Sequence, residues 1–295
     1  MMAKLVPITP EIFPLLYDAF LHDDDPMTDR AGWERVFLYG WDHGGDGAGY
    51  ALLHEGRAVG MMATAWSERR VRGERRRFCN VHTWWVHPDH RGHSITMLRP
   101  LIAMRGVTVT HFTPGDRVRS LFRRLGFQDL DATVKLLLPL GGDGDAVTFG
   151  HCDESGPARD HAPYGVHRAR IDGLDVLYIP VDRYRFRYCH ILHWNDDELF
   201  GRHEEAVRTA LMRRHGVRVV AVDRRRLRAH APRRALDFWA PAHALFRPEP
   251  GVEAADVDAL YSDVAMLRLA TLPHVTHELA KIVRRRLPNY VEEAA

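Results

Sequence analysis

The part of the chain between Met1 and Leu140 combines two periods of hydrophobic and polar positions, and each period predicts a different kind of element. Apolar residues recur at the spacing of an amphipathic helix near 10–22, 29–39, 92–104 and 116–125. Runs typical of strands lie near 48–54, 58–66, 75–87, 107–112 and 132–139. Because strands and helices alternate, the pattern predicts an α/β domain, of the α+β type with a mixed sheet.

A repeat links the two halves of the chain, because 71–109 aligns with 181–219 without a gap. Ten positions in this alignment are identical, including Cys79 with Cys189 and Trp84 with Trp194. Chance would give roughly two or three identities in such a window. The repeat predicts two tandem domains of one fold, and accidental similarity between two arginine-rich strand–helix–strand units is the alternative interpretation.

The stretch 141–163 has the composition of a connection between domains, since it contains Gly141-Gly142-Asp143-Gly144-Asp145 and Gly156-Pro157. We therefore predict a first domain at 1–145, a linker at 146–163 and a second domain at 164–295. Within the second part, the segment from Asp256 to Leu269 is predicted to be packed and to carry no chemistry.

Composition excludes several classes of protein. With 45% hydrophobic and 27% charged residues, the chain can bury a full core. No run of about 18 apolar residues occurs and the start lacks a secretory signal, so we expect a cytoplasmic protein without a membrane span. Three scattered cysteines, Cys79, Cys152 and Cys189, fit a reducing compartment better than a disulfide framework.

Neither nucleic-acid binding nor a metal site is predicted. All but three of the 41 basic residues are arginines, but no aromatic residues are interleaved with them and no known nucleic-acid-binding module is visible. The 19 histidines include no His-Glu-x-x-His pattern, and Cys79 with His82 lacks the further ligands that zinc requires. Trp84 and Trp85 are expected in the core and the wall of a cleft.

The segment from Trp84 to Leu98 is the most informative part of the sequence. A strand ends there, a short polar loop follows, and an apolar-periodic helix begins. The start of a helix exposes unpaired backbone N–H groups and the positive end of the helix dipole, so the loop from Arg91 to Thr96 is a candidate anion site. This geometry alone does not distinguish coenzyme A from other phosphate ligands.

The run Val86-x-Pro88-x-x-Arg91-Gly92 resembles the strand–loop–helix of the GNAT acyltransferases, whose loop binds the pyrophosphate of acetyl-CoA. The helix end Ser120 to Phe127 is similar to the family's L-Y-E-K-L-G-F motif. The resemblance implies an N-acyltransferase, most simply an N-acetyltransferase, that uses acetyl-CoA or another acyl-CoA in a direct attack. The cofactor contacts that it implies are Trp85, Val86, Arg91, Gly92, His93, Ser94, Ile95 and Thr96.

Four positions depart from the family pattern. Ser94 and Thr96 stand where the loop has glycine or alanine, but both can donate hydrogen bonds to a phosphate. Phe122 replaces a frequent tyrosine that is thought to return a proton to the leaving thiolate, so that role is absent or filled elsewhere. Gly115 replaces an asparagine that contacts CoA in the family.

The second copy is predicted to be a degenerate domain that binds no CoA. Glu204 and Glu205 would repel a pyrophosphate at the matching helix start. Asn195 is predicted to cap that helix, with acidic residues following it in the first turn. The resemblance implies that such a domain walls the acceptor cleft.

The strand before the loop carries two catalytic candidates, Asn80 and His82, because the base of the family often projects from it. Period-two alternation places both on one face with Trp84 and Val86. His82 is the candidate base, and a structural histidine is the alternative. The acceptor is predicted to be a small-molecule amine; a sugar amine, an amino acid, a polyamine and a protein lysine all stay open. An acyl carrier protein is the alternative donor, and a non-catalytic acyl-CoA-binding or interaction protein is the alternative function.

Overall fold

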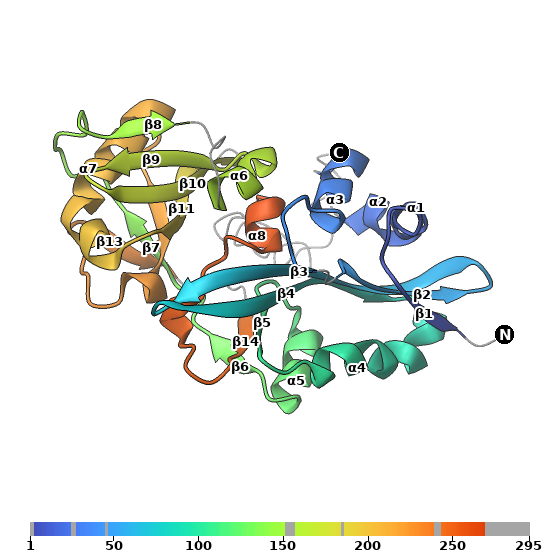
Figure 1. Cartoon of the computed structure of the whole chain (residues 1–295). Coiled ribbons are helices and arrows are strands. Elements are labelled where there is room, and N and C mark those ends of the chain that lie inside the picture. Colours follow the sequence, from blue (N-terminus) through green and yellow to red (C-terminus); the bar gives the residue numbers. More distant parts are fainter. Residues whose placement is uncertain are drawn as a thin grey trace, which may run out of the picture. The chain divides into compact units, whose positions relative to one another are not determined.

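The structure, a computed structural model, describes residues 3–24, 28–44, 47–150, 157–183, 186–238 and 243–268. It divides into two compact units that do not follow the order of the chain. Unit 1 contains the described residues up to Leu130 and the later segment Ala244–Leu267, whereas unit 2 contains those from Asp131 to His243 and Arg268. Each unit is built on one seven-stranded mixed sheet, which confirms the predicted α/β fold class (Figure 1).

The sheet of unit 1 has one parallel pair, β4 with β5, and antiparallel pairs elsewhere. Its strands, in spatial order, are β1 (Lys4–Pro7), β2 (Gly49–His54), β3 (Arg57–Val71), β4 (Glu74–Val86), β5 (Val107–His111), β14 (Ala244–Arg247) and β6 (Gln128–Leu130). The strands predicted near 48–54, 58–66, 75–87 and 107–112 are therefore present, and β1, β6 and β14 are additional.

Helices cover both faces of this sheet. On one face, α4 (Ser94–Ala103) and α5 (Asp116–Arg124) bury Met97, Leu98 and Phe122 in one apolar cluster with Cys79 and Val81 of β4. On the other face lie α1 (Phe13–Leu16), the π-helical turn η1 (Tyr17–Leu21), α2 (His22–Asp24), α3 (Arg30–Phe37) and α8 (Asp263–Met266). Figure 1 shows the two groups of helices on opposite sides of β3 and β4.

The sheet of unit 2 repeats the same strand order. Its strands, beginning at the edge that corresponds to β1, are β8 (Thr148–Gly150), β9 (His167–Ile171), β10 (Leu174–Arg183), β11 (Phe186–Trp194), β12 (Val220–Asp223), β7 (Val134–Leu137) and β13 (Ala235–Phe238). The long helix α7 (Asp197–His215) connects β11 to the parallel strand β12 and packs Phe200, Val207 and Leu211 on the sheet. Further short helical segments are α6 (Pro157–His161), η3 (Ala162–Tyr164) and η4 (Arg224–Leu227) in unit 2, and η2 (Pro88–His93) and η5 (Ala254–Asp256) in unit 1.

Each sheet contains one strand that comes from the other half of the chain. Strand β14 lies between β5 and β6 in unit 1, and β7 occupies the same slot, between β12 and β13, in unit 2. The predicted strand at 132–139 therefore exists as β7, but it belongs to the second sheet. The first stretch of unit 1 ends at Leu130, before the predicted boundary. The stretch predicted as a linker, 146–163, contains β8 and α6 of unit 2. Residues 151–156 of that stretch lie outside the described residues.

The strand–helix–strand unit that carries the sequence repeat occurs once in each sheet. Cys79 of β4 pairs with Val109 of β5, and Cys189 of β11 pairs with Val220 of β12, so the registers differ by one position. Both thiols are fully buried and neither forms a disulfide, and burial raises the pKa of Cys189 to about 12. Cys152 lies outside the described residues.

Candidate functional site

A β-bulge in β4 decides which side chains reach the candidate site. Thr64 of β3 pairs with Val81, but Met62 pairs with Trp84, so β4 has one extra residue between these positions. The predicted alternation is therefore wrong beyond His82. Trp84 and Val86 pack with Val81 on the face of α4 and α5, whereas Asn80 and His82 lie on the opposite face.

Trp85 follows the bulge to that opposite face. Its indole stacks on Phe20 of η1, with ring centroids 5.0 Å apart and an angle of 19° between the rings. Since α4 packs on the other face, the Trp85 side chain is directed away from the loop helix. A cofactor contact from Trp85, as predicted, would have to use its backbone.

The predicted anion loop forms a 3₁₀ helix, η2 (Pro88–His93), that runs directly into α4. The ring of His87 caps this helix, because its Nδ1 accepts a hydrogen bond of 3.3 Å from the amide of Asp89. The amide of Ser94 donates to the carbonyl of Arg91, in the pattern of a 3₁₀ turn. The amides of Asp89 and Ser94 are therefore already bonded within the protein, and an anion would need the turn to open before it could use them, or would use side chains.

The side chains of this loop are accessible. Arg91, Gly92 and Ile95 are exposed, the last at 66%, and His93, Ser94 and Thr96 are half-buried or exposed. A Cβ added at Gly92 would meet no atom within 4 Å, so the backbone there is open to a ligand. The structure thus gathers the predicted loop residues at one helix start, with Val86 and Trp85 at the end of the preceding strand.

The parallel ladder between β4 and β5 is short and ends near the bulge. It runs from Arg77 and Val107 to Asn80 and Thr110, whereas β4 continues to Val86 paired with β3 only. Beyond Asn80 and Thr110, the backbones of β4 and of the segment that continues from β5 are therefore no longer paired with each other as parallel strands. We call this place the divergence.

A chain of buried polar groups crosses the divergence. The Asn80 side chain accepts a hydrogen bond of 3.1 Å from the Thr110 hydroxyl and donates one of 3.2 Å to Oδ1 of Asp263. The hydroxyl of Thr113 donates to the other oxygen of Asp263 at 2.5 Å. Asp263 is 2% exposed, and it comes from α8, far downstream of Asn80 in the chain. Both ends of the Asn80 amide are therefore used within the protein.

Two histidines flank the divergence. His82 contacts Phe37 of α3 edge-on at 5.3 Å, and His111 contacts Phe122 of α5 at 5.5 Å. Burial lowers the pKa of each imidazole to about 3, and for His82 the neighbouring His111 contributes a smaller part of that lowering. The Nδ1 of His82 lies 3.1 Å from the Thr83 hydroxyl, but Nε2 of His82 and Nδ1 of His111 have no hydrogen-bond partner in the described chain. Both rings are thus neutral at pH 7, and each holds one unused polar atom in the interior.

Phe122 cannot return a proton to a thiolate. Its ring is fully buried and packs against Trp84, His111 and Phe127. At another departure from the family pattern, Gly115, α5 begins without a side-chain cap.

Unit 2 has a different arrangement at the matching helix start. Asp196, not the predicted Asn195, caps α7, because its Oδ1 accepts from the Leu199 amide at 2.8 Å. The residues that match the anion loop, 201–206, lie inside this α-helix, so their amides bond to carbonyls four residues back. Their backbone amides are therefore not available to a phosphate.

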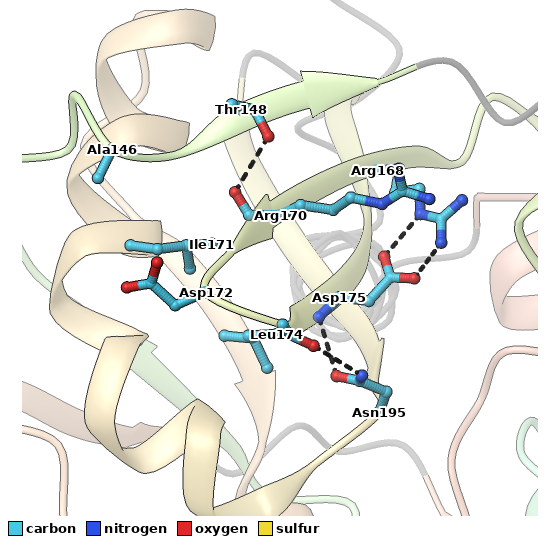
Figure 2. A pocket seen from close by; sticks show the side chains of 10 residues that line it. Ala146, Thr148, Arg168, Arg170, Ile171, Asp172, Leu174, Asp175 and Asn195 are labelled. Carbon is cyan, nitrogen blue, oxygen red and sulfur yellow. Dashed lines mark hydrogen bonds and ion pairs between the residues drawn. The ribbon is translucent and has the colours of Figure 1, made fainter.

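Asn195 instead fastens the turn between β9 and β10. Its side chain accepts from the Asp175 amide at 2.8 Å and donates to the Gly173 carbonyl at 3.0 Å, as Figure 2 shows. These residues line a cavity of about 370 Å³ in unit 2, together with Arg168, whose guanidinium donates two hydrogen bonds to the Asp175 carboxylate. Arg168, Asp175, Gly173 and Asn195 are therefore bonded to one another within this wall.

Sequence reasoning missed four residues of the candidate site: Thr110, His111, Thr113 and Asp263. His111 ends a correctly predicted strand, but the chain has 19 histidines and gives no reason to single it out. Asp263 lies in the segment predicted to be packed. That packing is confirmed for Val257–Leu267, all of it buried, and Leu269 lies outside the described residues. This packing also brings the carboxylate of Asp263 to the candidate site. The sequence analysis assigns no chemistry to this segment.

Two further features bear on the class of protein. No group of three or more His, Cys, Asp or Glu side chains among the described residues is arranged to hold a metal ion. None of the helices in the described ranges has the length and apolar character that a membrane span requires.

The chain resembles solved structures far more than it resembles known sequences. No protein-family profile matches it, and no protein with a curated description does so. A GCN5-related N-acetyltransferase from Kribbella flavida superposes with a TM-score of 0.54 and 15% identity, over 83% of this chain and 71% of that one. A second, from Anabaena variabilis ATCC 29413, gives 0.56 and 11%, over 83% and 72%.

A third structure, a putative acetyltransferase from Pyrococcus horikoshii, gives a TM-score of 0.56 and 12% identity, over 89% of this chain and 95% of that one. These alignments cover more of the chain than either unit contains, so both units take part. At such low identities the likeness shows the fold, and this fold is the one that the resemblance to the GNAT superfamily implies.

Proposed function

We propose, from the fold that this chain shares with GCN5-related N-acetyltransferases, that unit 1 transfers an acyl group from coenzyme A to an amine. The observation that supports this best is the divergence of β4 and β5. A strand leads there into an accessible helix start, and buried polar groups from β4, β5 and α8 meet at the same place. Where two strands stop pairing, their facing backbone groups can hydrogen-bond to an extended ligand such as the arm of a thioester.

The side chains of the loop offer the hydrogen-bond donors and the positive charge that bind a pyrophosphate. Arg91 offers a guanidinium suited to bidentate binding, and Ser94 offers a hydroxyl. Opening the 3₁₀ turn would add backbone donors, since such turns have weaker hydrogen-bond geometry than an α-helix. A CoA thioester is accordingly the proposed donor, with an acyl carrier protein as the alternative.

The neutral histidines fit a site that binds an uncharged group. Each imidazole has one N–H donor and one acceptor, and one such atom on each ring is unused among the described residues. We assign His82 to hydrogen bonding with substrate and Asn80 to positioning, because the Asn80 amide is bonded at both ends. The acceptor proposed is a small-molecule amine, since His82, Asn80 and Asp263 are all buried and a small amine reaches buried groups more readily than a lysine of a folded protein.

The test is incubation of the full chain with acetyl-CoA and a panel of amines, with thiol release and product mass measured. We expect thiol release that depends on the amine, and an acylated product.

A second function, binding of acyl-CoA without transfer, is favoured by Phe122 at the tyrosine position and by the bonded amides of η2. Saturable binding of acetyl-CoA without thiol release in the presence of any amine would establish that function instead.

A further inference from the structure

We propose that Asp263 is the general base of the acyl transfer, and that it accepts the proton of the amine. The proposal rests on the proposed function and names a residue for it that lies outside the strand–loop–helix. Its basis is position, because Asp263 hydrogen-bonds both to Asn80 on β4 and to Thr113 beyond β5. It is therefore a carboxylate that spans the divergence on the face opposite the loop helix.

The segment around Asp263 is firmly held in that place. Val257–Leu267 is buried throughout. The ring of Tyr261 contacts Trp41 edge-on at 5.3 Å and lies under the guanidinium of Arg69. Arg69 also binds the Asp258 carboxylate at 2.6 Å. A base fixed by contacts on both sides keeps its geometry during proton transfer, which is what an efficient base requires.

Other candidate bases near the divergence are less suitable. His82 and His111 are neutral, but with pKa values of about 3 they are too weak to take a proton from an alkylammonium ion. Asp258 is committed to the guanidinium of Arg69. Burial raises the pKa of Asp263, against the opposing effect of its hydrogen bonds from Thr113 and Asn80, and this makes it a stronger base than an exposed carboxylate.

The proposed step balances as follows. The alkylammonium gives one proton to an ionised oxygen of Asp263, and the freed lone pair attacks the thioester carbon. The C–N bond forms, the tetrahedral intermediate collapses, and the C–S bond breaks to release the CoA thiolate. The second N–H proton ends on that thiolate, and Asp263 returns the first proton to solvent. Oδ1 of Asp263 accepts a hydrogen bond from the Asn80 amide and Oδ2 accepts one from the Thr113 hydroxyl, and the backbone N–H groups of Asp263 and Val264 also bond to the carboxylate. The incoming proton therefore takes the place of one of these hydrogen bonds.

The experiment compares two acceptors at pH 7, benzylamine, which is then an ammonium ion, and aniline, which is then a neutral amine. Asp263→Asn should lower kcat with benzylamine by about 10²-fold or more, because only that amine must lose a proton before it attacks. With aniline the loss should stay below about fivefold, and the KM for acetyl-CoA should not change. A merely structural role would lower kcat equally for both amines.

Two further variants complete the test. Asp258→Asn removes a buried carboxylate from the same segment, so it should leave the ratio of benzylamine to aniline turnover unchanged. Asp263→Glu keeps the charge but displaces it by one methylene, so benzylamine turnover should fall about tenfold with aniline unaffected; this variant decides the matter if Asp263→Asn does not fold. Equal losses with both amines, or full activity of Asp263→Asn, overturn the inference alone. A wild-type chain that releases no thiol with any amine overturns the proposed function and the inference together.

Discussion

The two strand–helix–strand units of this chain differ in where the helix begins. In unit 1 the residues after β4 form a 3₁₀ helix capped by His87, and α4 starts only at Ser94. In unit 2 the residues at matching positions are already inside α7, which starts at Asp197. A shift of about two turns in the start of a helix thus decides whether a loop is available to bind an anion. The same fold carries a candidate site in one unit and none in the matching place of the other.

The interiors of the two units differ in the same sense. At the position that matches Ser94, unit 2 has Glu204, which is 1% exposed and lies 3.0 Å from Nε of the buried Arg208. Arg208 in turn donates to the carbonyls of Leu138 and Arg233. Burial raises the pKa of Glu204 to about 7 in spite of that guanidinium. In unit 2 this position is thus occupied by the buried pair of Glu204 and Arg208, whereas in unit 1 it belongs to an accessible loop.

A second difference lies at the end of β11. There the guanidinium of Arg226 lies 4.7 Å from the ring centroid of Trp194, the counterpart of Trp84. The indole of Trp194 also stacks on Phe200 and donates to Asp197 at 2.7 Å. In unit 1, by contrast, Nε1 of Trp84 has no partner among the described residues. At this position the indole N–H therefore has a side-chain acceptor in unit 2 and none among the described residues of unit 1.

The largest expected effect tests whether the units depend equally on their exchanged strands. Leu245 of β14 and Leu137 of β7 are both fully buried in the cores of their adopted units. Changing either to alanine should lower the free energy of unfolding by about 3 kcal/mol, measured by urea denaturation. Leu236→Ala on β13 is the control, because Leu236 is 57% exposed and should change stability by less than about 0.5 kcal/mol. Losses as small as the control at Leu245 or Leu137 would contradict the strand exchange.

The next prediction concerns the anion site itself. Gly92→Asp places a carboxylate in the loop of unit 1, and the added Cβ meets no protein atom that would disturb the fold. Repulsion of the pyrophosphate should weaken acetyl-CoA binding by about 10²-fold or more, as measured by calorimetry. Arg202→Asp, at the matching position of unit 2, should leave binding unchanged. Equal loss of affinity in both variants would show that the difference between the units is not the one described.

Acid should expose a third difference, at the position where unit 1 has His82 and unit 2 has Leu192; unit 2 has a buried histidine at another position, His190, whose pKa burial also lowers. The folded pKa of His82, about 3, lies below the value of about 6.5 in an unfolded chain. The unfolded state therefore takes up a proton that the folded state refuses, and stability is lost as the pH falls from 7 towards 3. Between pH 7 and pH 5 each of His82 and His111 should remove about 2 kcal/mol.

The measurement is urea unfolding at pH 7 and pH 5. His82→Gln should reduce the loss between the two pH values by about 2 kcal/mol relative to the unmodified chain, because glutamine takes up no proton in either state. Thr83→Val removes the partner of the ring without removing the ring, so it should keep the full loss. An unchanged loss in His82→Gln would mean that His82 is not buried as a neutral ring.

The smallest effect compares the two helix caps. Asp196→Ala removes a hydrogen bond of 2.8 Å at the start of α7 and should cost about 1 kcal/mol in the free energy of unfolding. His87→Ala removes a longer one, of 3.3 Å, from a 3₁₀ turn and should cost less than about half of that. Equal costs in thermal unfolding would indicate that the two helix starts are held with similar strength.

Local pattern predicts most of the elements of unit 1, and the exceptions have physical causes. The strand, loop and helix around His87 are predictable because period and loop composition are local signals. The bulge in β4 is not, since an extra residue in a ladder depends on the partner strand. The placement of Asp263 beside Asn80 is not predictable, because the chain passes into unit 2 after Leu130 and comes back to unit 1 only at Ala244. The spacing of residues in the sequence does not indicate this path. The repeat predicts similar halves, but it cannot indicate that β7 and β14 exchange places.

The exchange also sets an order of events during synthesis. When Leu130 has left the ribosome, the first sheet has β5 and β6 but lacks the strand between them, and that strand appears only with Ala244–Arg247. The pairing of His111 with Leu245 can therefore form only after the intervening chain, which includes β7, has been synthesised. Pairing between such distant residues slows folding and leaves open strand edges that invite aggregation. We expect the nascent first half to need shielding by a chaperone until the second half has emerged.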